Sequence, residues 1–208
     1  RQARMIAQAV TGTPGHVNAM AESVGHFARE IGAQNVFEGD VYVTNDPWMG
    51  TGHLHDITMV TPVFRKGVHI GFFACTAHVV DIGGRGFGPD AGEVFEEGLR
   101  IPPVKFLLEG RENRDVARFI RGNVRVPDQV MGDIQAQITA QAVCARRVLE
   151  FLDDTGLEDL TALSAELQGR ADRAMRKAIA ALPDGTWRGT VQADGYEAQE
   201  TRIECAVT

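Results

Sequence analysis

The feature that most constrains this chain is a pair of strand-like apolar runs joined by a short turn signal. Residues 56–64 (DITMVTPVF) and 67–80 (GVHIGFFACTAHVV) are rich in β-branched and aromatic side chains, and the Arg-Lys-Gly between them is typical of a hairpin turn. The motif His-x-x-Asp-Ile occurs at residues 53–57 and again at residues 78–82. The sequence therefore predicts a β-hairpin with one copy of this polar motif beside each strand.

Helical and strand patterns surround this hairpin. Further elements are predicted as a helix over 16–31, a strand over 41–44, helices over 113–124, 127–156 and about 160–182, and a strand hairpin over 186–208. This order predicts an α+β fold: a β-rich region carrying the site at 1–110, a helical region at 111–182, and the start of a following β region at 183–208.

Charge and cysteine content argue against several classes of protein. The 208 residues carry a net charge of −7 without a long Lys/Arg run, which disfavours nucleic acid or an anionic membrane as partner. No apolar stretch approaches the roughly 18–20 residues that span a bilayer. Three widely spaced cysteines fit a reducing cytoplasm. Because the chain begins with Arg1 and ends inside a strand-like run, we expect it to be part of a longer polypeptide.

Polar residues gather at the ends of the predicted strands and in the loops between them: Asn45, Asp46, His53, His55, Asp56, His78 and Asp81. Imidazole and carboxylate ligands suit zinc, manganese and iron, and two histidines with one carboxylate leave positions open for water or substrate. Positions i and i+3 of a strand point to opposite faces, so His53 and Asp56 can meet at one ion only if the chain bends there. Ordinary surface hydrogen bonding explains a His-x-x-Asp pattern equally well, and the residues alone leave both interpretations open.

The glycine-rich segment 83–93 also has two interpretations. It lacks the spacing of a phosphate loop, so it is either a backbone cradle for a substrate anion, with Arg85 as the cation, or a lid or tight crossing of chains. Glu93, Glu96 and Glu97 fit a solvated helix face better than a general base. His16, at the entry to the first predicted helix, caps either the site or that helix.

The order of the motifs resembles that of the hydantoinase B/5-oxoprolinase family. The segments that carry the resemblance are GDVYVTNDPWMGTGHLHDITMVTPVF, AHVVDIGGRGFGP, EVFEEGLRIPPVKF, GDIQAQITAQAVCARRVLE and ALPDGTW, and they run over essentially the whole chain. The resemblance implies a subunit of an ATP-dependent hydrolase acting on cyclic amides such as hydantoins, 5-oxoproline or lactams. It also implies a hetero-oligomer with a hydantoinase A-type partner, separate or fused, that binds the ATP.

The resemblance also assigns site residues. It places a divalent metal, zinc or manganese, on His53, Asp56 and His78. Further positions that match the family motifs are Asp46, Asp81 and His16, which we take as catalytic or supporting residues. This chain departs from the pattern at His55, where relatives carry a proline, and at 88–90, where Gly-Pro-Asp replaces Pro-Gly-Ser. Both departures bear on the substrate more than on the metal.

Amide chemistry explains why such an enzyme needs two parts. Resonance protects an unstrained amide from hydroxide, and phosphorylating the carbonyl oxygen removes that protection. No ATP-binding motif is recognisable here, so we expect the partner to phosphorylate and this subunit to act on the product with a metal-activated water. Gly83, Gly84 and Arg85 are the candidates for holding the phosphate. The alternatives are a subunit of an ATP-dependent ketone carboxylase of the acetone or acetophenone type, and a non-catalytic scaffold subunit.

Overall fold

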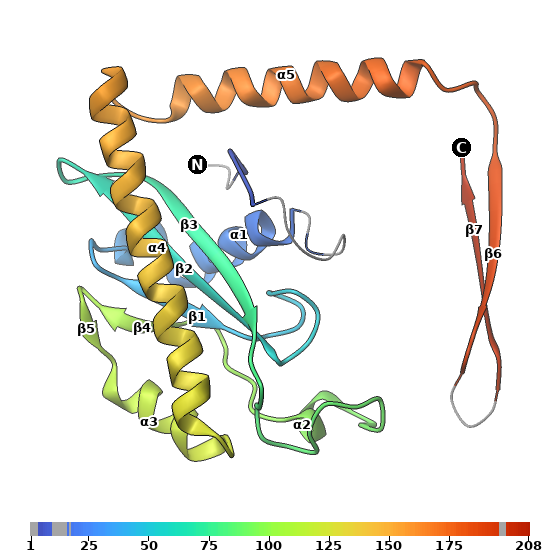
Figure 1. Cartoon of the computed structure of the whole chain (residues 1–208), viewed down its shortest axis with the longest axis horizontal. Helices are drawn as coiled ribbons and strands as arrows, with labels where there is room; N and C mark the ends of the chain where they lie inside the picture. The colour runs from blue at the N-terminus through green and yellow to red at the C-terminus, as the bar shows by residue number, and fades with distance from the viewer. Residues whose placement is uncertain (1–3, 10–15, 17, 196–198) are drawn as a thin grey trace. The chain divides into compact units, whose positions relative to one another are not determined.

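Figure 1 shows the computed structural model of the chain, which describes residues 4–9, 16, 18–195 and 199–208. Its elements are α1 (Ala19–Ile31), the 3₁₀ turn η2 (Ala33–Asn35), β1 (Val41–Thr44), β2 (Asp56–Arg65), β3 (Val68–His78), α2 (Val94–Glu97), β4 (Val104–Leu108), β5 (Arg111–Glu112), α3 (Arg114–Asn123), α4 (Pro127–Thr155), α5 (Thr161–Ala180), β6 (Trp187–Ala193) and β7 (Thr201–Val207). This mixture of helix and antiparallel sheet confirms the predicted α+β class. The chain divides into two compact units, 1–162 and 163–208.

The first unit is built on a five-stranded antiparallel sheet in the order β3-β2-β1-β4-β5. The hairpin of β2 and β3 forms as predicted, and Lys66 and Gly67 both have positive φ (51° and 77°), the geometry that matches a tight turn to the strand twist. Strands β4 and β5 were not predicted. The run of β4 is only five residues long and follows two prolines, so its strand character comes from pairing with β1 rather than from a local pattern.

Helices cover both faces of this sheet (Figure 1), and the strand residues alternate accordingly. Val43, Ile57 and Met59 are buried in one cluster with Val130 and Ile134 of α4. A second cluster joins Val24 and Phe27 of α1 to Tyr42 and Val60. Burying each such side chain contributes about 1.5–3 kcal/mol. Asp56 and Val60 are four positions apart in β2, so their side chains lie on the same face of the sheet. The Asp56 carboxylate therefore faces the α1 side.

Helix α4 follows its sequence signals closely. Pro127 occupies its first turn, Gly156 adopts the left-handed conformation at its end, and the helix was predicted to within one residue. Gln141, buried on the side that faces the sheet, donates from Nε2 to the carbonyl of Met59 at 2.9 Å. Satisfying a buried amide against the strand backbone fixes how α4 lies on β2.

A buried carboxylate ties the entry of β1 to β4. Asp40 is fully buried and accepts hydrogen bonds from the backbone N–H groups of Phe37 and Glu109 and from the Tyr42 hydroxyl, and it lies 2.7 Å from Lys105 Nζ. Burial is the largest influence on its pKa and opposes ionisation. The hydrogen bonds, beginning with that of Lys105, together outweigh burial and hold the pKa of Asp40 below its ordinary value.

The second unit consists of most of α5 and the hairpin of β6 and β7. In this hairpin Trp187 lies opposite Val207 and Val191 opposite Ile203, which confirms the strand pair predicted from the sequence. One face of the ribbon is apolar and all its residues are exposed within the chain. Within the described ranges, no helix combines the length and the apolar character that crossing a membrane requires.

Candidate functional site

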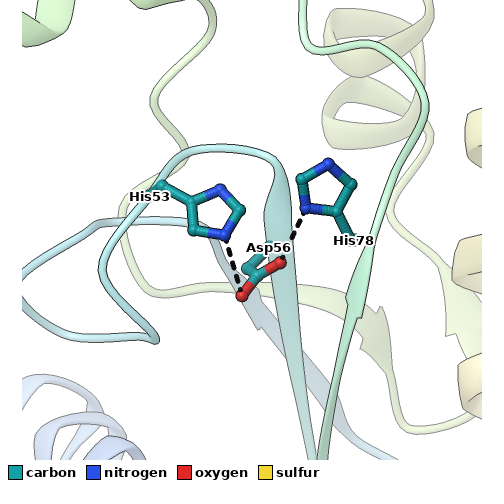
Figure 2. A group of neighbouring side chains, drawn as sticks. All are labelled: His53, Asp56 and His78. Carbon is teal, nitrogen blue, oxygen red and sulfur yellow. Dashed lines mark hydrogen bonds and ion pairs between the residues drawn. The ribbon is translucent and has the colours of Figure 1, made fainter. Parts of the chain in front are cut away.

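The register of the β2–β3 hairpin places Asp56 directly opposite His78. As Figure 2 shows, the His78 ring lies beside one carboxylate oxygen, with 3.2 Å between His78 Nδ1 and Asp56 Oδ1. Residues paired across an antiparallel sheet have neighbouring side chains on the same face. The hairpin therefore brings the aspartate of the first His-x-x-Asp motif to the histidine of the second.

His53 reaches the same carboxylate because the chain turns before β2. Gly52 has φ +106°, a conformation that other residues rarely adopt, and the turn-rich segment 47–55 ends where β2 begins. This is the bend that the His53–Asp56 spacing required. The Nε2 atom of His53 lies 3.3 Å from Asp56 Oδ2, on the other side of the carboxylate from His78 (Figure 2).

Two further groups surround Asp56. His16, which precedes α1, places Nε2 at 3.4 Å from Asp56 Oδ2, and the Thr51 hydroxyl donates to the same oxygen at 2.7 Å. Only 3% of the Asp56 side chain is exposed. A buried carboxylate is costly unless it is paired and hydrogen-bonded, and here three imidazoles and one hydroxyl supply that compensation. His16 therefore lies at the site and does more than begin a helix.

The geometry of this cluster suits a divalent ion. One potential ligand atom from each of His53, Asp56 and His78 lies within 4.8 Å of the others. Ligands 2.0–2.1 Å from a tetrahedral zinc ion are separated by about 3.3 Å. His53 Nε2 and His78 Nδ1 lie 3.3 Å and 3.2 Å from the Oδ2 and Oδ1 atoms of Asp56, one on each oxygen. The other ring nitrogen of His53, Nδ1, is buried and has no hydrogen-bond partner among the described residues. The donor set and its spacing thus fit the metal implied by the sequence resemblance.

His55 lies beside these ligand candidates but outside the group that can converge on one ion. Its ring is stacked on His78 at 5.2 Å between centroids and 13° between planes, and the residue is 5% exposed. Burial, followed by the charges that His78 and His53 can carry, lowers the pKa of His55. A neutral, buried imidazole in this place supports the His78 ring. The structure thus places His55 against a ligand candidate, and its effect on the choice of substrate stays a prediction.

Asp46 and Asn45 organise the loop that leads to His53. Asp46 accepts from Trp48 N at 2.9 Å and forms an ion pair with Arg100, whose Nε is 2.8 Å away. Asn45 donates to the carbonyls of Leu54 and Leu99 and accepts from Ile101 N. Both residues are buried, and among the described residues neither side chain is hydrogen-bonded or ion-paired to the Asp56 cluster. Arg100 was not singled out from the sequence, because its partner lies 54 positions away.

Asp81 anchors the base of the glycine-rich loop. It accepts from Gly83 N at 3.2 Å and from both the backbone and the side chain of Arg125, and Arg125 also donates to the carbonyls of Gly83 and Gly84. Burial is the largest influence on the pKa of Asp81 and raises it, but the hydrogen bonds from Arg125 and Gly83 prevail and hold that pKa low. Arg125, 44 positions from Asp81, gave no signal in the sequence.

The glycine-rich loop is tight at its base and open at its tip. A Cβ on Gly83 would lie 2.4 Å from the Asn123 carbonyl oxygen, and one on Gly84 would lie 2.4 Å from the carbonyl carbon of Glu97. This is the close crossing of chains that was one of the two interpretations of the sequence. Arg85 donates to the Asp90 carbonyl at 2.7 Å and lies 3.5 Å from Glu96, while Glu96 and Glu97 belong to the short helix α2.

We expect Gly84→Ala to destabilise this loop far more than Gly86→Ala. Both glycines have positive φ, but only at Gly84 would the new methyl group overlap a neighbouring backbone, whereas Gly86 has open space. Overpacking adds about 1–3 kcal/mol to the backbone strain that both variants share. Limited proteolysis of the loop and urea unfolding would show the difference, and equal effects of the two substitutions would contradict it.

The fold and the cluster define a class of protein: an α+β scaffold whose sheet presents a histidine–carboxylate cluster with spacing that fits a divalent ion. The family follows from comparison with known proteins. The family model described as Hydantoinase B/oxoprolinase matches residues 1–208, and the chain belongs to this family.

Similar proteins agree with this assignment. The chain is 40% identical over 177 residues to the beta subunit of caprolactamase from Pseudomonas jessenii and 38% identical over 163 residues to the B-type subunit of a putative D-/L-hydantoinase from Pseudomonas sp. (strain NS671), covering 84% and 76% of this chain. It spans 30% and 28% of the length of those relatives. The crystal structure of ATP-dependent caprolactamase from P. jessenii matches with a TM-score of 0.82 at 34% identity, covering 92% of this chain and 34% of that one.

Proposed function

We propose that the chain forms the metal-binding part of the catalytic subunit of an ATP-dependent cyclic-amide hydrolase. The observation that carries this proposal is the buried carboxylate of Asp56, with His53, His78 and His16 within 3.4 Å of it. Catalytic metal sites in proteins combine such a donor set with positions left open for water or substrate. The hydrolase and hydantoinase relatives support the class of substrate, a ring containing an amide bond.

Within this proposal, some residues bind the divalent ion and others hold those residues in place. His53, Asp56 and His78 hold the divalent ion, which when bound lowers the pKa of a water molecule toward neutrality. Thr51 fixes the orientation of the Asp56 carboxylate through its hydroxyl, and His55 supports the face of His78. His16, with a side chain 32% exposed, lies at the solvent side of the cluster, with Nε2 3.4 Å from Asp56 Oδ2.

The same proposal assigns a role to the remaining site residues. Asp46 and Asp81 act as positioning residues. Asp46 holds the start of the loop before His53 through Trp48 N and pairs with Arg100, and Asp81 with Arg125 fixes the base of the glycine-rich loop. Arg85 is proposed to hold the phosphate of the activated amide, while Gly83 and Gly84, whose backbone is bonded to Asp81 and Arg125, form the fixed base of the loop that carries it. The ion pair of Arg85 with Glu96 and its hydrogen bond to the Asp90 carbonyl are both exposed, and such contacts are worth little, so the guanidinium can exchange them for a phosphate oxygen at small cost.

ATP is proposed to be used by a hydantoinase A-type partner, with which the full-length protein forms a hetero-oligomer. The decisive experiment combines the full-length protein with that partner and measures ATP hydrolysis in the presence of ε-caprolactam, hydantoin or 5-oxoproline. We expect release of ADP to require one of these cyclic amides and the ring-opened product to accumulate. Dependence on bicarbonate and a ketone would instead favour a carboxylase. Turnover that survives both His53→Ala and His78→Ala would reduce this subunit to a scaffold.

A further inference from the structure

Phe87 combines high exposure with a position against the candidate site. It lies in the glycine-rich loop, and 79% of the residue is open to solvent. Its ring nevertheless lies 5.2 Å from the His55 ring, 5.3 Å from the His78 ring and 6.3 Å from the His53 ring, measured between centroids. One large apolar side chain thus touches the histidine cluster on one side and leaves its other side unpacked.

The orientation of Phe87 makes a corner of aromatic rings around His78, in which the Phe87 ring is the apolar side. Phe87 is nearly perpendicular to both His55 and His78, with interplanar angles of 81° and 86°, while His55 is stacked flat on His78. Aromatic rings prefer these edge-to-face and stacked arrangements, so the corner is a favourable packing and not a chance approach. The corner borders the most exposed of the metal-ligand candidates, since the His78 side chain is 48% exposed.

The loop holds Phe87 from a fixed base while leaving its tip free. At the base, Arg125 bonds the carbonyls of Gly83 and Gly84, Arg85 N donates to the Glu96 carbonyl, and Leu99 N donates to the Ile82 carbonyl. At the tip, Phe87 stands between Gly86 and Gly88, and a Cβ added to Gly86 would meet nothing within 4 Å. A ring carried in this way keeps its place at the cluster but can shift to accommodate a bound molecule.

We propose that Phe87 is a substrate-positioning residue, whose ring forms an apolar wall for the hydrocarbon part of a cyclic amide while the amide group faces the Asp56 cluster. This inference rests on the proposed function and adds to it the recognition of the substrate ring. Burial of apolar surface on binding is the physical reason, because the exposed face of Phe87 gains the contact that it lacks in the free protein. The wall should therefore favour rings with more methylene groups.

The test compares Phe87→Ala with Phe87→Leu in the full-length protein combined with its ATP-binding partner. The control is Phe95→Ala, because Phe95 on α2 is similarly exposed at 72% but has no ring contact with the histidines among the described residues. Kinetics are measured with ε-caprolactam and with 2-pyrrolidinone, which has two fewer methylene groups. Binding of each lactam without ATP is measured by calorimetry, and the metal content of each variant is measured by elemental analysis.

We expect Phe87→Ala to raise KM for ε-caprolactam about tenfold, the effect typical of losing a small apolar contact, with little change in kcat. The loss for 2-pyrrolidinone should be smaller, about threefold, because fewer methylene groups lie against the wall. Phe87→Leu should retain most of the affinity for ε-caprolactam, and Phe95→Ala should have the same KM as the unsubstituted protein. The lactam affinities measured by calorimetry should rank the variants in the same order. All variants should contain as much metal as the unsubstituted protein.

Three outcomes would overturn the role of Phe87: unchanged KM and lactam binding in Phe87→Ala, equal losses for the two ring sizes, or loss of metal, which would show a structural role. Failure of the proposed function would look different. In that case the unsubstituted protein itself would neither bind nor turn over any lactam, and the wall would be rejected together with the function.

Discussion

Replacing Asp56 with asparagine should remove the divalent ion and lower kcat/KM for a cyclic amide by more than about a hundredfold, because losing even an outer partner of a metal ligand costs on the order of 10–100-fold. Asparagine keeps the shape of the side chain but carries no charge, and the carboxylate is the only anionic group among the three residues that can converge on an ion. Metal content by elemental analysis and steady-state kinetics of the reconstituted enzyme would check both effects.

The matched control for this substitution is Asp128→Asn. Asp128 also pairs with a basic side chain, Arg121, but 96% of it is exposed and it lies on α4. We expect this control to retain its metal and its activity. An Asp56→Asn protein that keeps a full complement of metal and turns over at a similar rate would rule out the metal centre as described.

The largest expected effect on stability is that of Asp40→Ala, which should lower the free energy of unfolding by about 3–5 kcal/mol, as breaking a buried ion pair usually does. The substitution leaves Lys105, whose side chain is only 18% exposed, without its carboxylate, and it removes the acceptor of the Tyr42 hydroxyl and of two backbone N–H groups. Urea unfolding of the full-length protein would measure it. Asp128→Ala, which breaks an exposed pair, should change stability by less than about 1 kcal/mol.

The same carboxylate should make stability depend on pH in acid. The pKa of Asp40 is lower in the folded protein than in the unfolded chain, where it is about 3.9. A group of this kind contributes stability that is fully present above the unfolded pKa and is lost as the pH falls through the folded pKa. The difference in unfolding free energy between the unsubstituted protein and Asp40→Asn should therefore shrink as the pH falls below about 4. A constant difference down to about pH 2 would contradict this assignment.

Much of the fold was predictable because most elements carry local signals. The 29-residue helix α4 begins at a proline and ends at a glycine, and the β2–β3 hairpin carries its own turn residues. Strand β4 was missed because pairing with β1, some sixty positions earlier in the chain, makes it a strand. The domain boundaries that we expected at 110 and 182 remain a prediction. The chain divides into two compact units near residue 162, but that division rests on contacts in space, whereas our boundaries followed changes in secondary structure along the sequence.

Residue types and spacing by themselves determined which side chains of this protein are the candidates for the site. The two His-x-x-Asp motifs and the family resemblance follow from short-range pattern, because they depend only on neighbours along the chain, and the His53–Asp56 spacing set a bend as the condition for a shared ion. Only the tertiary structure decided which residues of the two motifs lie together. The hairpin register unites Asp56 with His78, while Asp81 turns to Arg125, 44 positions away, and Phe87 comes to lie over the histidines. Such partners are chosen by packing between distant segments, and no local pattern encodes that choice.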